Sequence, residues 1–242
     1  MGDDDPLIPP TEGVGKQAAK AALRGLTGAV PYVGPPLSEA LATIINAPLQ
    51  RRIHDWREEV MRRIQALEER LEGFSEASLL ANENFASAVI EAQMAIMRSN
   101  AKEKHEALAN AVLNVALDRG PDDDRLQMFM AYIADLTPWH LRLLSLFNDP
   151  AGVSQRVGVN MSNISLGGIS TLVERVYPEL RGHKDFYTQL ANDLTYKGLL
   201  DGVEFGVTMT GQGMVAKRTT NAGDEFIRFV SAPPELTEAD AG

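Results

Sequence analysis

Residues 52–74 read RIHDWREEVMRRIQALEERLEGF, and this stretch decides the fold that the sequence predicts. Its apolar residues follow one another at intervals of 3, 4, 4, 3, 4 and 3 positions, a mean of 3.5, which is the repeat of a coiled-coil seam. The members of this seam are Ile53, Trp56, Val60, Ile64, Leu67, Leu71 and Phe74. Charged residues fill the positions between them, so the other faces of the expected helix face solvent.

The seam needs an apolar partner along roughly 33 Å of helix. The sequence leaves open whether that partner is another helix of the same chain or a second molecule. We therefore take the seam as a candidate site for oligomerisation or for contact with another protein.

The composition favours packed helices over a β-sandwich or a β-barrel. Of the 242 residues, 44% are apolar but only 6% are aromatic, which is typical of a core built from Ala, Leu and Val. The chain has no cysteine, which excludes disulfides, thiolate metal sites and a cysteine nucleophile.

Both ends of the chain are expected to be disordered tails, at residues 1–13 and 233–242. The first ten residues, MGDDDPLIPP, are acidic and proline-rich, unlike the basic start and apolar core of a signal peptide. The longest run without charge near the N-terminus, residues 25–38, has 14 residues and three prolines, too short to span a bilayer. We therefore expect a cytoplasmic protein.

Residues 14–52 are basic although the net charge of the chain is −10. Lys16, Lys20 and Arg24 lie four apart on one face of an Ala-rich helix, and a second helix is expected from about Glu39 until Pro48 interrupts it. A basic amphipathic helix beside an apolar hairpin fits contact with an anionic membrane surface. The commoner alternative is a helix packed on the bundle, because alanine buries too little area to anchor in lipid.

The helical pattern continues to residue 135. Apolar positions between Phe85 and Val115 predict a second long helix, which Gly120-Pro121 ends. Asp122–Asp124 should open the next helix, where the dipole favours carboxylates, and its buried stripe should hold Leu126, Phe129, Met130 and Ile133. Residues 14–135 are thus predicted to form a helical bundle or coiled-coil domain.

Residues 136–232 have a different pattern. Thr137 and Pro138 open a helix that stops at Asp149-Pro150, and further helices are expected near 169–177 and 184–197. Residues 207–210 and 214–217 read as two strands joined by a glycine-containing loop, followed by a helix with Phe226, Ile227 and Val230. Three helices, a β-hairpin and a closing helix are typical of a winged-helix-like domain.

The predicted fold class is therefore mainly α: a long-helix bundle or coiled-coil hairpin followed by a winged-helix-like domain with one small β-hairpin. Several motifs also resemble an uncharacterised bacterial family that joins a helical half to a winged-helix-like end. They are Met209-Thr-Gly-Gln-Gly-Met214, Lys217-Arg-Thr-Thr220, Gly223–Phe229, Leu136-Thr-Pro-Trp-His140 and Phe147-Asn-Asp-Pro150. The resemblance covers roughly residues 30–230. It implies a fold and a bacterial origin, but neither an activity nor site residues.

A winged-helix-like domain raises the hypothesis of DNA binding. The candidate contacts are Lys184 and Lys197 on the expected recognition helix and Lys217 and Arg218 at the hairpin. Residues 181–232 hold six basic and six acidic side chains, so attraction to phosphates would depend on local arrangement alone. The balanced charge argues against DNA as a partner, whereas the predicted winged-helix-like fold argues for it.

No catalytic, cofactor or metal site is predicted. Gly15-Lys16 lacks the glycine and hydroxyl residue of a phosphate-binding loop. The four histidines, His54, His105, His140 and His183, lack zinc-ligand spacing and are expected at the surface or as helix caps.

Three functional hypotheses follow, in this order. The first is a non-enzymatic scaffold or regulatory protein that acts by oligomerisation and protein contact through its long amphipathic helices. The second is a membrane-active effector of the cell-death or defence type that uses residues 14–50. The third is a winged-helix DNA-binding regulator.

Overall fold

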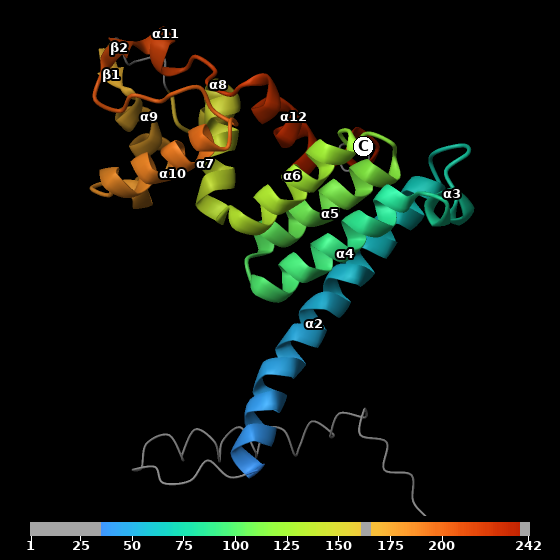
Figure 1. The fold of residues 1–242 in the computed structure, drawn as a ribbon. Coiled ribbons are helices and arrows are strands. Elements are labelled where there is room, and N and C mark those ends of the chain that lie inside the picture. Colours follow the sequence, from blue (N-terminus) through green and yellow to red (C-terminus); the bar gives the residue numbers. More distant parts are fainter. Residues whose placement is uncertain (1–34, 161–165, 238–242) are drawn as a thin grey trace, which may run out of the picture. The chain divides into compact units, whose positions relative to one another are not determined.

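The computed structural model describes residues 35–160 and 166–237, with side chains from Asn46 onward except those of Ala47 and Glu76. The elements in chain order are α2 (Pro35–Glu68), α3 (Glu76–Leu80), α4 (Glu83–Arg98), α5 (Lys102–Ala116), α6 (Asp123–Asp135), α7 (Pro138–Asn148), α8 (Pro150–Arg156), β1 (Leu166–Gly168), α9 (Ile169–Val176), η1 (Pro178–Leu180), α10 (Lys184–Tyr196), β2 (Thr208–Thr210), α11 (Gly211–Met214), α12 (Asn221–Val230) and α13 (Pro234–Thr237). The prediction of a mainly helical protein with one small sheet is confirmed (Figure 1).

The chain divides into two units between Glu58 and Glu59, inside α2. The first unit is described from Pro35 as a continuous helical stretch. The helix begins at Pro35 rather than near Glu39, because a proline at the start of a helix lacks an N–H that would have no partner there. Pro48 lies inside the helix and does not end it.

The second unit begins with the last part of α2, which is shorter than the predicted seam. The helix ends at Glu68, and Gly73 then adopts a positive φ of 86°. Leu71 and Phe74 therefore lie in the turn beyond α2, and the expectation of one seam helix reaching Phe74 is wrong. Glycine suits this turn because it reaches positive φ without a steric cost.

The long helix expected between Phe85 and Val115 is two helices, α4 and α5, and this part of the prediction is wrong. The chain reverses at Ser99, whose hydroxyl accepts a hydrogen bond from the Ala101 N–H at 3.2 Å. Nε2 of His105 lies 2.8 Å from the Ser99 carbonyl oxygen and holds the same corner. The reversal lets α4 pack back onto α5.

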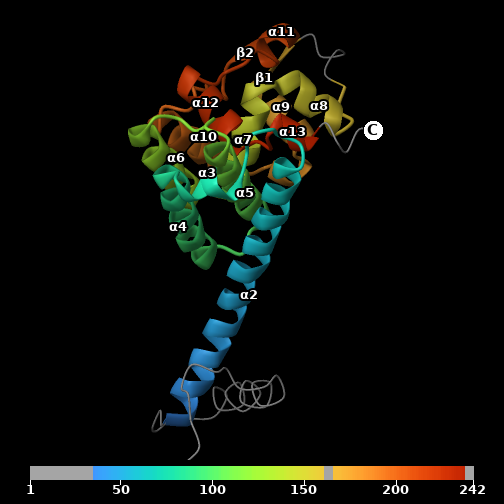
Figure 2. The same cartoon turned by 90° about the vertical axis from the view of Figure 1, so that its right-hand side faces the viewer.

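Helices α4, α5 and α6 pack on one another and form the core of the second unit, as the views of Figure 1 and Figure 2 agree. Ten consecutive residues of α5, from Ala107 to Ala116, are buried, so this helix lies in the centre. Asp122 caps α6 by accepting from the Arg125 N–H at 3.0 Å. The predicted buried stripe of α6 is confirmed at all four positions: Leu126, Phe129, Met130 and Ile133.

The part after residue 136 contains the predicted helices but a different sheet. β2 pairs antiparallel with β1, with Leu166 opposite Thr210 and Gly168 opposite Thr208. The expected second strand at 214–217 is absent from the described residues, and the hairpin prediction is wrong. Thr210 instead caps the short helix α11 by accepting from the Gly213 N–H at 3.2 Å.

Helix α12 contacts both α5 and α7 and so connects the bundle with the later helices. Its last carbonyls have side-chain partners on α5. Nδ2 of Asn114 donates to the carbonyl oxygens of Phe229 and Ser231, each at 2.9 Å. Nδ2 of Asn110 donates to the Val230 carbonyl at 3.0 Å. The two amides satisfy acceptors that a helix end leaves without an internal partner.

An aromatic cluster completes this contact. Phe129 of α6 lies edge-on against Phe226 at 5.2 Å between ring centroids, and 5.8 Å from Phe229. The predicted boundary at 135/136 therefore falls inside the second unit.

Residues 234–237, which were expected to belong to a disordered tail, form α13.

Candidate interaction surface

The central part of the predicted seam is covered by the chain itself. Val60, Ile64 and Leu67 are buried within the second unit, and Leu67 has no exposed surface. In the first unit Ile53 and Trp56 are also buried, whereas Leu71 and Phe74 are half-buried. A partner could reach Val60, Ile64 and Leu67 only by displacing residues of this chain.

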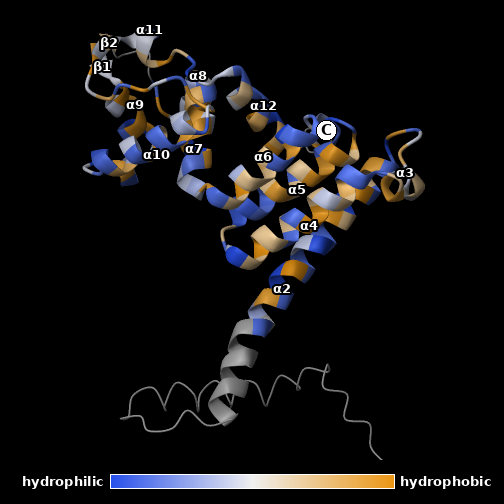
Figure 3. Ribbon diagram, in the orientation of Figure 1, coloured by the Kyte–Doolittle hydropathy of each residue, from blue (hydrophilic) through white to orange (hydrophobic). Residues whose placement is uncertain are grey.

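A second apolar face, on α4, is open to solvent. Ile90, Met94 and Met97 are 59%, 41% and 46% exposed and lie at intervals of four and three residues, so they form one stripe along the helix. We call these three residues the α4 stripe. Figure 3 shows apolar positions along α4. The opposite side of α4 packs inward, with Ala88, Ala92, Ala95 and Ile96 buried.

Two opposite charges flank the α4 stripe on one side. Glu91 and Arg98 are both exposed and are seven residues apart, about two helical turns, so they lie on the same edge of the helix. Within the described part of the chain neither forms an ion pair. The stripe and this charged edge are free to meet another surface.

Two of the four lysine and arginine side chains proposed for DNA contact are paired with acidic groups. Nζ of Lys197 lies 3.2 Å from Asp135 Oδ2 and 4.7 Å from the ring centroid of Tyr132. Lys217 forms an ion pair with Asp224. The charge of each lysine is largely balanced where it lies, which weakens its attraction for phosphate.

The other two DNA candidates differ from each other. Arg218 is engaged inside the domain, where it donates to the backbone oxygens of Gly213, Met214 and Ala216, and burial lowers its pKa. Lys184 is exposed at the start of α10. Of the four residues, Lys184 alone has no described ion pair or hydrogen bond, so the structure does not bring the four together as one basic surface.

The residues proposed to meet a membrane, Lys16, Lys20 and Arg24, lie outside the described residues. Among the helices of the described part, none combines the length and apolar character needed to cross a bilayer. The membrane hypothesis stays a prediction.

A polar cluster that sequence reasoning missed lies where α5, α6, α7 and α10 meet. Nδ1 of the buried His140 accepts from the Thr137 N–H at 3.1 Å, and Nε2 lies 3.4 Å from Asp193 Oδ2. Burial lowers the pKa of His140 below its usual 6.5, although Asp193 acts in the opposite direction. Both ring nitrogens contact protein groups, so His140 acts as a helix cap.

The same cluster contains a buried lysine. Lys104 is 7% exposed and its Nζ donates to the Ala134 carbonyl oxygen at 2.6 Å. Burial lowers its pKa, and Asp135 partly offsets this effect. The sequence signal for this cluster is a lysine at the start of a mostly apolar helix. Lys104 is too far along the chain from His140 and Asp193 for the three residues to be recognised as a motif. The cluster satisfies buried polar groups and presents no free nucleophile.

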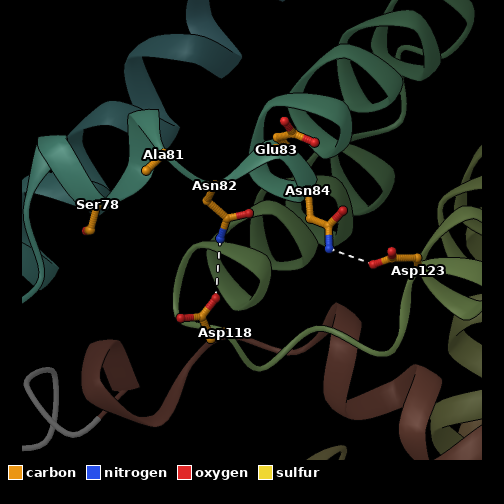
Figure 4. A pocket seen from close by; sticks show the side chains of 7 residues that line it. All are labelled: Ser78, Ala81, Asn82, Glu83, Asn84, Asp118 and Asp123. Atoms are coloured by element: carbon orange, nitrogen blue, oxygen red, sulfur yellow. Dashed lines mark hydrogen bonds between the residues drawn. The ribbon is translucent and has the colours of Figure 1, made fainter.

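A polar pocket of about 490 Å³ lies beside the start of α4 (Figure 4). Nδ2 of Asn82 donates to Asp118 Oδ1 at 3.3 Å, and Nδ2 of Asn84 donates to Asp123 Oδ1 at 2.8 Å. These side chains therefore contact each other across the pocket. Across the described part of the chain, no group of three or more His, Asp or Glu side chains is arranged to hold a metal ion.

No protein-family profile, curated protein or solved structure matches this chain. The resemblance to an uncharacterised bacterial family therefore stays an expectation.

Proposed function

We propose that this protein is a non-enzymatic scaffold or regulatory protein that acts by self-association through the α4 stripe. The observation that supports this proposal is the set of three large apolar side chains, Ile90, Met94 and Met97, aligned on one exposed helix face. A continuous exposed apolar surface marks a protein contact more often than scattered single residues do.

The α4 stripe suits this role better than the seam on α2. Val60, Ile64 and Leu67 already contribute to the core of the second unit, so exposing them would lose burial that stabilises the fold. The α4 stripe can be covered without opening the bundle. Self-association therefore leaves the described fold intact.

The expected association is weak and reversible. Full burial of an Ile or Met side chain contributes about 1.5–3 kcal/mol, and each member of the stripe is already about half covered. Six such side chains across two copies then contribute on the order of 5–9 kcal/mol, against an association cost of roughly 4–15 kcal/mol. The mass in solution should depend on protein concentration.

Light scattering over a concentration series tests the proposal. We expect the mass of the wild-type protein to rise above the 26.4 kDa of one chain, and Met94→Lys to hold it at that value. Met128→Lys is the matched control, because Met128 of α6 is 49% exposed and the chemical change is the same. Circular dichroism checks that both variants keep their helices. The proposal is overturned if the wild-type protein stays monomeric at every concentration. It is also overturned if Met94→Lys and Met128→Lys reduce self-association equally.

A further inference from the structure

Resting on this proposed function, we infer that the partner of the α4 stripe is the same helix of a second copy, packed antiparallel about a two-fold axis beside Met94. The inference depends on the pattern of the exposed residues of α4, Ile90, Glu91, Met94, Met97 and Arg98. This pattern is complementary to itself in one orientation only.

The apolar residues define the axis. A two-fold axis perpendicular to α4 reverses the helix, so a residue on one side of the axis meets the residue equally far on the other side in the second copy. The midpoint between Ile90 and Met97 falls next to Met94. Ile90 of one copy then packs near Met97 of the other, and each Met94 meets its equivalent.

The charged residues independently place the axis within one residue of the same position, about 1.5 Å along the helix. The midpoint between Glu91 and Arg98 also falls next to Met94. Because the axis keeps the charged edges of both helices on one side of the contact, Glu91 of each copy meets Arg98 of the other, and two ion pairs form. In a parallel arrangement the two-fold axis runs along the helices and places the two charged edges on opposite sides of the contact, so Glu91 would not meet Arg98 and neither ion pair would form.

The length of α4 sets the scale of the contact. Its 16 residues span about 24 Å, so the contact of one helix from each copy falls at the low end of protein interface sizes, below about 1,200 Å². Such an interface is transient. The protein therefore suits a switch that responds to its own local concentration.

Charge reversal tests the orientation. Glu91→Arg places arginine opposite Arg98, and Arg98→Glu places glutamate opposite Glu91, so each change alone should raise the dimer dissociation constant roughly 3- to 30-fold. The double variant exchanges both charges and should return to within about threefold of the wild-type value. The effect of each single change should shrink at high salt. The inference is overturned if the dissociation constant of the double variant rises by the product of the two single effects.

Engineered thiols give a second, independent measurement, because the wild-type chain has no cysteine. Met94→Cys should form a disulfide-linked dimer under mild oxidation, and Met128→Cys should not. Ile90→Cys mixed with Met97→Cys should cross-link, whereas Ile90→Cys alone should not. Cross-linking of Ile90→Cys alone indicates parallel helices and overturns the inference.

The outcomes separate this inference from the function that it rests on. A wild-type chain that never associates removes both, and leaves α4 facing solvent or a different protein. A wild-type chain that associates and is disrupted by Met94→Lys, but not by either charge reversal, keeps the function and overturns the antiparallel arrangement.

Discussion

Helices α4 and α5 lie side by side and use polar and apolar residues in opposite ways. α5 buries two asparagines, Asn110 and Asn114, in the centre of the unit. α4 carries Met94 and its two apolar neighbours to the surface. The asparagines are buried because α12 supplies carbonyl partners for them. The apolar residues of α4 are exposed because the described chain offers nothing to cover them. Partners, rather than polarity alone, decide where each residue lies.

The largest expected effect is a cavity in α5. Leu113 has no exposed surface, so Leu113→Ala should lower the free energy of unfolding by about 2–5 kcal/mol. Met94→Ala on α4 removes a side chain that is 41% exposed. This change should alter the free energy of unfolding by only about 0.5 kcal/mol. Urea denaturation in dilute solution measures both. Equal losses would contradict the contrast between the two helices.

The next effect concerns the buried amides. Asn114→Ala leaves the carbonyls of Phe229 and Ser231 without their α5 donor, so the free energy of unfolding should fall by about 1–3 kcal/mol. The control is Asn100→Ala, at an exposed asparagine in the turn between α4 and α5. Its free energy of unfolding should lie within about 0.5 kcal/mol of the wild-type value. If the two variants have the same free energy of unfolding, the amide of Asn114 does not stabilise the contact with α12.

A third effect depends on pH. Burial lowers the pKa of His140 in the folded chain, so the folded state binds a proton there less readily than the unfolded state does. Its contribution to stability is therefore complete above the unfolded pKa of about 6.5 and decreases as pH falls through the lower folded value. Unfolding free energies between about pH 7.5 and 5.5 should decline, and less steeply in His140→Gln.

Asp193 raises the pKa of His140, whereas Lys197 and Lys104 lower it in the same direction as burial does. His54→Gln is the control, since His54 lies on an exposed face of α2 next to Glu58. A decline that is unchanged in His140→Gln would assign the pH dependence to other groups.

The smallest effect lies just beyond the end of α5. Arg119 forms an ion pair with Glu235 of α13, and its hydrogen bond lowers the pKa of that carboxyl. Because Arg119 is largely exposed, solvent screens the pair, and Arg119→Ala should lower the free energy of unfolding by about 0.2–1 kcal/mol. Chemical denaturation measures the change. A larger loss would mean that α13 is part of the core rather than an attachment to it.

The sequence predicts the individual helices well wherever a local signal is strong. Thr137 and Pro138 open α7 as predicted, and Asp122 caps α6 where Asp122–Asp124 were expected to open a helix. Each of these features depends on one or two residues that no distant contact has to complete. For this reason they can be identified without the fold.

The errors arise where distant contacts decide. Neither glycine nor proline marks the reversal at Ser99, so the apolar pattern of α4 continues into α5 as though one helix held both. Thr208–Thr210 is a strand as predicted, but its partner, Leu166–Gly168, lies about forty residues earlier rather than in the next turn. Strand pairing is set by contacts that local pattern does not contain.

The candidate surface on α4 has a signal in the sequence. Ile90, Met94 and Met97 fall on the face of α4 opposite Ala92 and Ile96, which the sequence shows once the helix is drawn as a wheel. The seam on α2 is the longer and more regular apolar pattern. Sequence spacing does not link His140 with Lys104, because the neighbours of these two residues come from four separate helices.

The dependence of α5 on α12 also has a consequence for synthesis on the ribosome. Asn114 and the Phe229 carbonyl that it binds are 115 residues apart. A nascent chain that has emerged only as far as α6 holds two amides with no acceptor in place, so water must solvate the middle of the bundle until α12 arrives. This protein can therefore close its interior only after α12 has been synthesised.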